Sequence, residues 1–432
     1  MANAVTTEAV QASTTTTNSS RGAMPVVTTL FFMWGFLTCL NDILVPHLKA
    51  IFDLKYVQVM LVQFAFFSAY ALFAIPSGKV IDWIGYKKTM VAGLMTMALG
   101  ALLFIPAASV PSFPLFLAAL MILAAGITAL QVSANPYVAV LGSPETASSR
   151  LNWTQAFNSL GTFVAPFIGG ALILSSAPKT VEQMRQMAAP ELQAYRLHEA
   201  ASVKLPYLGL AIALFVLGLI IAKVHLPKLS VEHHDPSSKP TGSVWKRSHL
   251  VLGALAIFVY VGAEVSIGSF LVNYLSQPNI GNMAEKMAAN YVALYWGGAM
   301  VGRFIGSALL RKVKTGTLLG IFAGAAASLV LVSMVTTGHV AMWSILAVGL
   351  FNSIMFPSIF TLAIAELGTL TGKGSGIIVS AIVGGAIIPV IQGALADRFG
   401  IQPAFLLPVV CYMYIAYFAL KGSLVKPQEA AA

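Results

Sequence analysis

The sequence predicts an all-α membrane protein with twelve transmembrane helices in two six-helix bundles. Composition is the first reason, because the 432-residue chain is 58% hydrophobic and only 9% charged. Soluble domains carry about a quarter charged residues, so a soluble protein of this composition would lack the polar surface to cover itself. The second reason is that the apolar residues gather in runs of about 20, the length of a helix that crosses the bilayer core.

Twelve such runs follow one another along the chain. They fall near 25–46, 57–81, 88–108, 113–141, 151–176, 205–226, 247–276, 287–310, 315–336, 341–367, 374–395 and 402–421. The polar segment 227–246 lies between the sixth and seventh runs, and we interpret it as a cytoplasmic linker between two halves, 25–226 and 247–421. Residues 1–24 predict a disordered cytoplasmic tail, because they bury too little apolar surface to fold, and 422–432 predict a second tail.

The basic residues predict which way the helices run. If both termini are cytoplasmic, the inner loops contain about twice as many of the 25 lysines and arginines as the outer loops. Basic loops are retained on the cytoplasmic side of a membrane. The surplus of positive charge therefore indicates an orientation in the lipid bilayer and no nucleic-acid partner. Cys39 and Cys411 lie inside apolar runs, which favours buried residues over a disulfide framework or a metal site.

Two segments in equivalent positions suggest that the halves are related. Residues 159–172 (SLGTFVAPFIGGAL) align without gaps on 382–395 (IVGGAIIPVIQGAL). Gly161 then meets Gly384, and nearly the same offset places Asp42 beside Glu264. Two bundles related by an axis along the membrane normal are a known transporter architecture, with the substrate site near the bilayer midplane between the repeats.

Few ionisable side chains lie deep inside the predicted spans. Among the carboxylates these are Asp42 and Glu264, and among the bases Arg303. An ionisable group costs at least ~2.5 kcal/mol at the helix centre, so each one needs a partner or a function. Asp42 is predicted to bind substrate and couple a cation, with an interhelical salt bridge as the alternative. The same role is predicted for Glu264, whose alternative is a packing position between glycines.

The surroundings of Asp42 suit a sugar. Trp34, Thr38 and Asp42 are spaced four apart and share one helix face, and Asn41 lies beside it. Carboxylates and amides bind sugar hydroxyls in pairs, and an aromatic ring covers the apolar face of a pyranose. Trp34 is one candidate for this stacking, and Tyr260 is another.

Carboxamides recur on the fourth and fifth predicted spans. Gln131 and Asn135 are four residues apart and share one helix face, and Asn152, Gln155 and Asn158 recur at three-residue spacing. Hydrogen bonds between helices are the alternative role, at only ~0.6 kcal/mol each. Five amides are better explained by a wet, polar cavity. In the second half, Asn352 offers a similar group.

The segment GKVIDWIGYKK, residues 78–88, joins the second and third spans. Its predicted role is structural and gating: Gly78 permits close helix approach, Asp82 caps a neighbouring helix, Gly85 makes the turn and Lys87 anchors the cytoplasmic face. Arg303 is grouped with these structural residues. The spans contain no phosphate loop, zinc-type His/Glu pair or Ser–His nucleophile, so we predict no enzyme, no cofactor and no metal ligand. The one metal left open is a sodium ion near Asp42.

These motifs resemble the major facilitator superfamily. NDILVPHL, GITALQVSANPYVAVLG, SRLNWTQAFNSLG, VGAEVSIGSFLVNY and FPSIFTLAIAELG are similar, more narrowly, to the fucose:proton symporter family and its glucose/galactose branch, over about 25–421. The resemblance implies a bacterial inner membrane protein acting as a monomer. It matches Asp42 to the family's essential first-helix aspartate, Gln155 and Asn158 to its sugar-binding amides, and Arg303 to its helix-eight arginine.

One residue departs from the family pattern. The fucose carrier has a glutamate, its proposed proton acceptor, where this chain has Gln131. A glutamine does not take up a proton at physiological pH, so coupling must rest on Asp42, on Glu264 or on bound sodium.

The expected function is a cation-coupled symporter, proton or sodium, importing a hexose such as glucose or galactose by alternating access. An uncoupled facilitator is the nearest alternative. Other sugars, namely N-acetylglucosamine, mannose, fructose and fucose, suit the same groups. A membrane enzyme acting on lipid-linked sugars would need a catalytic cluster near one interface, which we do not find. A transporter-like sensor would need a large soluble module.

Overall fold

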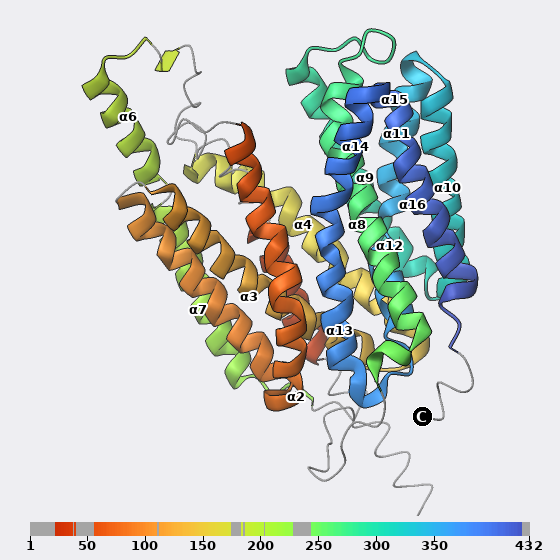
Figure 1. Ribbon diagram of the computed structural model, residues 1–432. Coiled ribbons are helices and arrows are strands. Elements are labelled where there is room, and N and C mark those ends of the chain that lie inside the picture. Colours follow the sequence, from red (N-terminus) through yellow and green to blue (C-terminus); the bar gives the residue numbers. More distant parts are fainter. Residues whose placement is uncertain are drawn as a thin grey trace, which may run out of the picture. The chain divides into compact units, whose positions relative to one another are not determined.

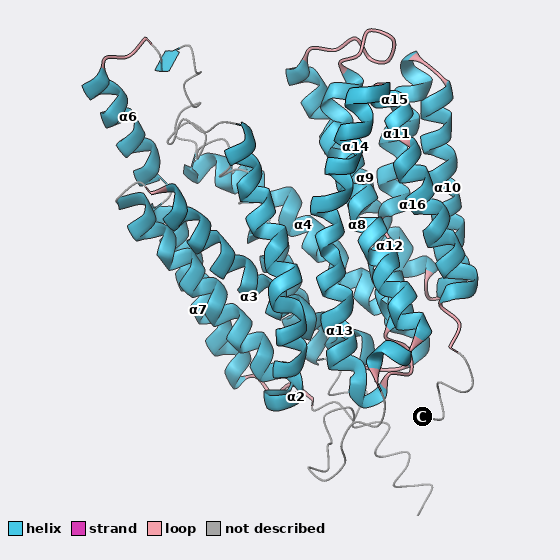
Figure 2. Cartoon of the chain, viewed as in Figure 1, coloured by secondary structure: helices cyan, strands magenta, loops and turns pink. Residues whose placement is uncertain are grey.

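The structure is a computed structural model that describes residues 22–37, 39, 56–109, 112–173, 183–184, 186–202, 204–227 and 243–425. Across these residues the chain is helical, with no strand (Figure 2). Eight helical stretches among them are long and apolar enough to cross a membrane, and the shorter helix Gly22–Leu37 is apolar as well. The prediction of an all-α membrane protein is confirmed.

The helices of the predicted first half follow its apolar runs, with the exception of α6. They are the first helix Gly22–Leu37, α2 Tyr56–Ser109, α3 Phe113–Val140, α4 Ala147–Ile173, α6 Ala189–Ser202 and α7 Lys204–Lys223. The 54-residue α2 contains two predicted spans, 57–81 and 88–108, which meet at Gly85. Gly85 has φ 82° and ψ 167°, a backbone conformation open to glycine but strained for other residues. The predicted turn is therefore a single non-helical residue.

The second half is broken into more pieces. They are α8 Ser248–Leu275, α9 Glu285–Leu309, α10 Thr315–Val335, α11 Gly338–Asn352, α12 Met355–Ala363, α13 Thr371–Ser380, α14 Gly384–Phe399, α15 Ile401–Ala404 and α16 Leu406–Tyr417. The predicted span 341–367 comprises α11 and α12, and 374–395 comprises α13 and α14. Helix breaks inside a membrane are tolerated where protein or water satisfies the freed backbone groups.

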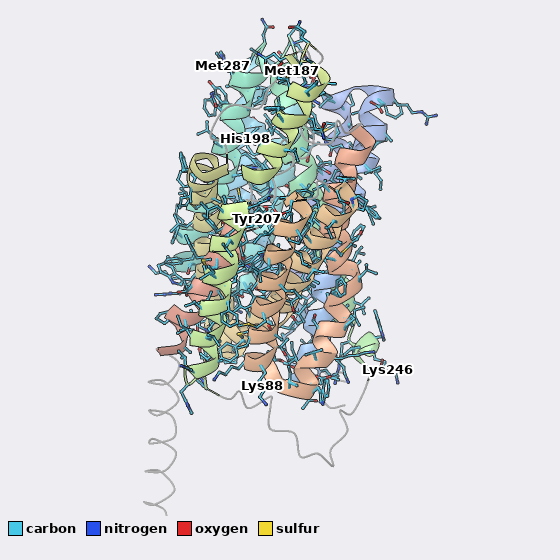
Figure 3. All side chains as sticks on the ribbon, turned by 90° about the vertical axis from the view of Figure 1, so that its left-hand side faces the viewer. Lys88, Met187, His198, Tyr207, Lys246 and Met287 are labelled. Carbon is cyan, nitrogen blue, oxygen red and sulfur yellow. The ribbon has the colours of Figure 1, made fainter. Side chains whose placement is uncertain are left out.

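One helix was not predicted at all. α6 lies in the polar gap between the fifth and sixth predicted spans, and its sequence, APELQAYRLHEAAS, is too polar to cross a bilayer. A search for long apolar runs passes over such a helix. Figure 3 labels His198 on α6 at one end of its unit and Lys88 on α2 at the opposite end.

Packing divides the described residues into two compact units, whose boundaries differ from the predicted halves. One unit contains those within Met1–Leu30, Ala134–Ala156 and His225–Ala432, and the other those within Phe31–Ser133 and Phe157–Val224. The division thus groups the end of α3 and the start of α4 with the helices of the second half. The two predicted bundles, 25–226 and 247–421, remain a prediction.

In the first of these units α8 is central. It packs against α9, α12, α14 and α16, as Figure 1 shows. In the other unit α2 packs against α7. Tyr207 of α7, labelled in Figure 3, is buried against Phe104 of α2 with ring centroids 4.3 Å apart.

The glycines of the predicted repeat occupy equivalent places in the two units. A Cβ atom at Gly161 of α4 would collide with the main-chain oxygen of Phe32 on the first helix. A Cβ atom at Gly384, at the start of α14, would collide with the main-chain oxygen of Phe258 on α8. The first helix and α8 are themselves the opening spans of the two predicted halves. The aligned glycines therefore allow the same close helix contact twice.

Candidate functional site

Gln131 lies on α3 and is buried. Its Nε2 donates a hydrogen bond of 2.9 Å to the hydroxyl of Tyr70 on α2. Its Oε1 is also buried and accepts no hydrogen bond from the described part of the chain. Buried polar atoms are normally hydrogen-bonded, so an unused carbonyl oxygen marks a place that suits a donor.

One turn further along α3, Asn135 shows the complementary arrangement. Its Oδ1 accepts a hydrogen bond of 3.3 Å from Nε2 of Gln155 on α4. Its Nδ2 is buried and makes no hydrogen bond to any residue that the structure describes. Gln131 thus has an unused acceptor and Asn135 an unused donor. A hydroxyl group both donates and accepts, so hydroxyls fit both atoms.

Asn158 has its amide nitrogen engaged by the main chain. The Nδ2 donates to the Phe31 oxygen over 3.0 Å, and Gly35 lies directly against the main chain of Asn158. Thr162, one turn later, donates to the Gly35 oxygen over 3.3 Å. Asn158 therefore helps to fix the first helix against α4, and its predicted contact with sugar remains a prediction.

The predicted partners on the first helix are only partly described. Trp34 is buried beside Phe31, with ring centroids 5.3 Å apart. Asn41 and Asp42 lie outside the described residues, so their predicted roles, and that of a sodium ion near Asp42, are unchanged by the structure.

Glu264 is the centre of a buried polar network on α8. Its Oε1 accepts a hydrogen bond of 2.9 Å from the Tyr260 hydroxyl, one turn earlier on the same helix. The Tyr260 hydroxyl also lies 3.1 Å from the main-chain oxygen of Asn352, the last residue of α11. The ring of Tyr260 is only 1% exposed, so the side chain serves the network and offers no open face for a sugar.

Asn352, predicted as a sugar ligand, uses both ends of its amide inside the protein. Its Nδ2 donates to the Tyr295 hydroxyl over 2.7 Å, and its Oδ1 accepts from the Tyr412 hydroxyl over 2.8 Å. The Tyr295 hydroxyl in turn donates to the main-chain oxygen of Glu264 over 3.2 Å. The network therefore joins α8, α9, α11 and α16 through one glutamate, one asparagine and three tyrosines.

Arg303 of α9 borders this network. Its Nε donates to the Ser353 oxygen over 3.3 Å, at the break between α11 and α12, and its charge acts on Glu264. The main-chain oxygen of Arg303 accepts from Nδ2 of Asn152 over 2.6 Å. Arg303, which was predicted to be structural, therefore lies beside Glu264. Of the two carboxylates predicted to couple a cation, Glu264 is the one that the structure describes.

The first turns of α4 are held to the second half by hydroxyl groups. Ser149 and Ser307 each donate to the other's main-chain oxygen, over 2.7 and 3.0 Å. The Ser148 hydroxyl lies 2.6 Å from that of Thr361 and accepts from Thr315 over 2.9 Å. This cluster, Ser148, Ser149, Ser307, Thr315 and Thr361, is called the serine clasp below. No ion pair is needed to form it.

The predicted gating segment, residues 78–88, has part of the expected form. Gly78 is buried, Gly85 makes the break in α2, and Lys87 donates to the Ala222 oxygen over 2.9 Å near the end of α7. A lysine at the last carbonyls of a helix both bonds to them and complements the helix dipole. Asp82 is exposed.

The sequence reasoning missed Tyr295, Tyr412, Tyr70 and the serine clasp. Tyrosines and serines are ordinary residues in membrane helices and carry no charge that needs explaining. The one available signal was the four-residue spacing of Tyr260 and Glu264, which places them on one helix face. Among the described residues no three His, Cys, Asp or Glu side chains gather as a metal site would require.

Apolar helices that bury a glutamate and several carboxamides, with an arginine beside the glutamate, are typical of a multi-pass membrane transporter. The chain belongs to the major facilitator superfamily, whose sequence profile matches residues 26–382, and within it to the fucose:proton symporter family, glucose/galactose branch. Its relatives are transporters, and the prediction that it is not an enzyme is confirmed.

Three comparisons support the assignment. The chain is 55% identical over 401 residues to a glucose/galactose transporter of Brucella abortus, covering 93% of this chain and 94% of the relative. It is 36% identical over 397 residues to the L-fucose-proton symporter of Escherichia coli, covering 90% of each. The crystal structure of FucP in the outward conformation matches with a TM-score of 0.88 at 34% identity, over 94% of this chain and 100% of that one.

Proposed function

We propose that the chain is a cation-coupled symporter that imports a hexose such as glucose or galactose by alternating access. The observation that carries the proposal is the unused pair of buried amide atoms on α3, Oε1 of Gln131 and Nδ2 of Asn135. The 55% identity to a glucose/galactose transporter supports a hexose as the partner of such groups.

The chemistry of these amides favours a hydroxylated, uncharged solute. An unused acceptor suits a hydroxyl hydrogen, and an unused donor suits a hydroxyl oxygen. A site built to hydrogen-bond hydroxyls rejects analogues that lack them, because its own buried polar groups would then stay unpaired. Gln155 supports the site by holding Asn135 through its Oδ1, which leaves the Asn135 nitrogen free for substrate.

Coupling is assigned to a carboxylate, because Gln131 stands where the fucose carrier has its proposed proton acceptor. Asp42 and Glu264 are the candidates, and each would be neutralised by a proton or by sodium before the loaded site closes. An uncompensated buried carboxylate would oppose that closure. The fucose relatives are described as proton symporters, which supports the symport class. We further place the protein, as a monomer with both termini cytoplasmic, in a bacterial inner membrane.

Counterflow in proteoliposomes tests the proposal. Vesicles holding purified protein are preloaded with an unlabelled sugar, and uptake of the labelled sugar is followed for glucose, galactose, mannose, fructose, fucose and N-acetylglucosamine. Counterflow needs no driving force, so it reports the substrate apart from the coupling. The proposal expects saturable counterflow with glucose or galactose.

The same vesicles then separate the remaining possibilities. Accumulation driven by a pH or sodium gradient supports symport, whereas counterflow that neither gradient converts into accumulation would show an uncoupled facilitator. Counterflow with one of the other sugars alone would change the assigned substrate. Absence of counterflow with every sugar would refute the proposal. Gln402 provides a control: it is a glutamine of α15 whose amide nitrogen is occupied, because it donates to the main-chain oxygens of Ser333 and Thr336 over 2.9 and 2.8 Å. Gln131→Leu should weaken sugar binding at least tenfold, and Gln402→Leu should not.

A further inference from the structure

We infer that Glu264 is a proton-binding site, and that Tyr260 and Asn352 form the hydrogen-bonded chain that accommodates the proton. The inference deepens the proposed function, on which it rests, by choosing a proton over sodium at this carboxylate. It follows from counting the hydrogen atoms available to the network rather than from the presence of an acid alone.

The count begins at Tyr260. A tyrosine hydroxyl has one hydrogen to donate. Two oxygen atoms lie within reach of it, Oε1 of Glu264 at 2.9 Å and the main-chain oxygen of Asn352 at 3.1 Å. While Glu264 is ionised it accepts only, so the single hydrogen must be shared between two acceptors.

A proton on Glu264 resolves the shortage. The protonated carboxyl has a hydrogen of its own and donates it to the Tyr260 oxygen. Tyr260 then donates its hydrogen to Asn352, whose carbonyl ends α11 and lacks a partner within the helix. The Tyr260 oxygen and the Asn352 carbonyl each have a hydrogen bond of their own once one proton has been added. The geometry of the network is therefore suited to the binding of one proton at Glu264.

The protein also accommodates the ionised form of Glu264, as is required of a site that binds and releases a proton in each transport cycle. Arg303 on α9 places its positive charge near Glu264. The other titratable groups that face Glu264 are Tyr260 on its own helix, Tyr295 on α9 and Tyr412 on α16. On α14, Asp397 and Arg398 lie in the last turns, more than two turns beyond Ile388, which contacts α8 at Gly262.

Asn352 is the positioning residue of the chain. Tyr295 and Tyr412 hold the two ends of its amide, which fixes the last residue of α11 and with it the carbonyl that Tyr260 reaches. Asn352 is fully buried, whereas Glu264 is 9% exposed. Glu264 is thus the most exposed member of the chain.

Sodium fits this place less well. Freed backbone carbonyls and helix C-terminal ends are the groups that coordinate sodium in transporters. Here the Ser353 carbonyl at the break after α11 is already in use by Arg303, and only the Asn352 carbonyl, which shares the hydrogen of Tyr260, is left beside the carboxylate. A proton needs no ligand shell and leaves both bonds in place.

Glu264→Gln is the decisive variant. The glutamine amide donates to Tyr260 as the protonated carboxyl does, so the variant should fold and mimic the loaded state. The rate of its counterflow, whatever its size, should be independent of pH, and the variant should lose accumulation driven by a pH gradient. In the unchanged protein, counterflow should fall as pH rises through the pKa of Glu264. Tyr260→Phe should shift that pH profile. The control Tyr274→Phe, on the same helix with its hydroxyl bonded to Ser333, should not.

A second measurement is independent of transport. Infrared difference spectra of the purified protein between low and high pH should contain the carbonyl band of a protonated carboxyl that is missing in Glu264→Gln. If no band depends on Glu264, or if Glu264→Gln accumulates sugar at the original level, the inference is wrong and the symporter proposal stands. Accumulation driven by sodium alone would also overturn it. Absence of counterflow would refute the proposed function, and the infrared band would then still decide the protonation of Glu264.

Discussion

At the scale of single residues, Asp42 provides the first prediction. Asn is nearly the same size as Asp but does not ionise, so Asp42→Asn removes the charge that a cation would neutralise. We expect uphill accumulation of sugar to be lost while counterflow persists. Gradient-driven uptake and counterflow, measured on the same vesicles, check this. Full accumulation by the variant would exclude Asp42 from coupling.

Single residues also show how far the candidate site could be predicted from the sequence. Glu264 could be recognised, because an acid in an apolar span needs a partner or a function. Its neighbours Tyr295 and Tyr412 could not, since they lie far away in the chain and tyrosines are ordinary in membrane helices. Asn352 was predicted as a sugar ligand, but tyrosines occupy both ends of its amide.

At the scale of helices, the predicted spans and the observed helices agree where composition decides the outcome. Long apolar runs became helices because lipid demands that every backbone group be bonded within its segment. The exceptions have local causes. Gly85 breaks α2 in a single residue, α11 ends at Asn352 where side chains satisfy the freed carbonyls, and α6 is too polar to be recognised as a span.

The repeated glycine contacts give a second prediction. Gly161→Ala and Gly384→Ala should each destabilise the protein, because a methyl group would strike the backbone of the neighbouring helix. Overpacking of this kind typically costs about 1–3 kcal/mol. Gly209→Ala on α7 and Gly324→Ala on α10 are matched controls, since nothing lies within 4 Å of a Cβ atom there. Thermal unfolding in detergent should show lower melting temperatures for the first pair only.

The serine clasp gives a third prediction. The hydroxyls of Ser149 and Ser307 lie 3.3 Å apart, within the range that a disulfide can bridge after substitution by cysteine. If α4 and α9 part during each transport cycle, oxidised Ser149→Cys/Ser307→Cys protein should lose counterflow and regain it on reduction. The single variants should be insensitive to oxidant. Unimpaired counterflow in the cross-linked protein would show that this contact stays closed.

At the scale of the whole molecule, the fold class and family could be predicted because membrane insertion depends on composition, which the sequence displays directly. The internal arrangement could not, since the packing division groups Ala134–Ala156 with the second half. Hydrogen bonds such as the one between Asn152 and Arg303 join residues that are far apart in the chain, and no local sequence pattern predicts them.

Topology is the prediction at this scale. With both termini inside, a cysteine at Ser237 should react only with reagents that reach the cytoplasmic face, and one at Thr180 only from the opposite face. The native Cys39 and Cys411 are buried and should not react with the labelling reagent. Labelling of intact cells and of inverted vesicles with an impermeant maleimide provides the measurement. Reactivity of both sites from the same side would contradict the orientation.

The paired contacts at Gly161 and Gly384 are what a duplicated and fused ancestral gene would leave behind. Both copies of such a scaffold would keep these glycines, because a Cβ atom there would strike the neighbouring backbone, while the chemistry of the two copies could diverge. Such a division of labour makes the architecture evolvable. Residues such as Gln131 and Glu264 can be exchanged to alter the cargo or the driving ion, and the junctions that assemble each copy need never change.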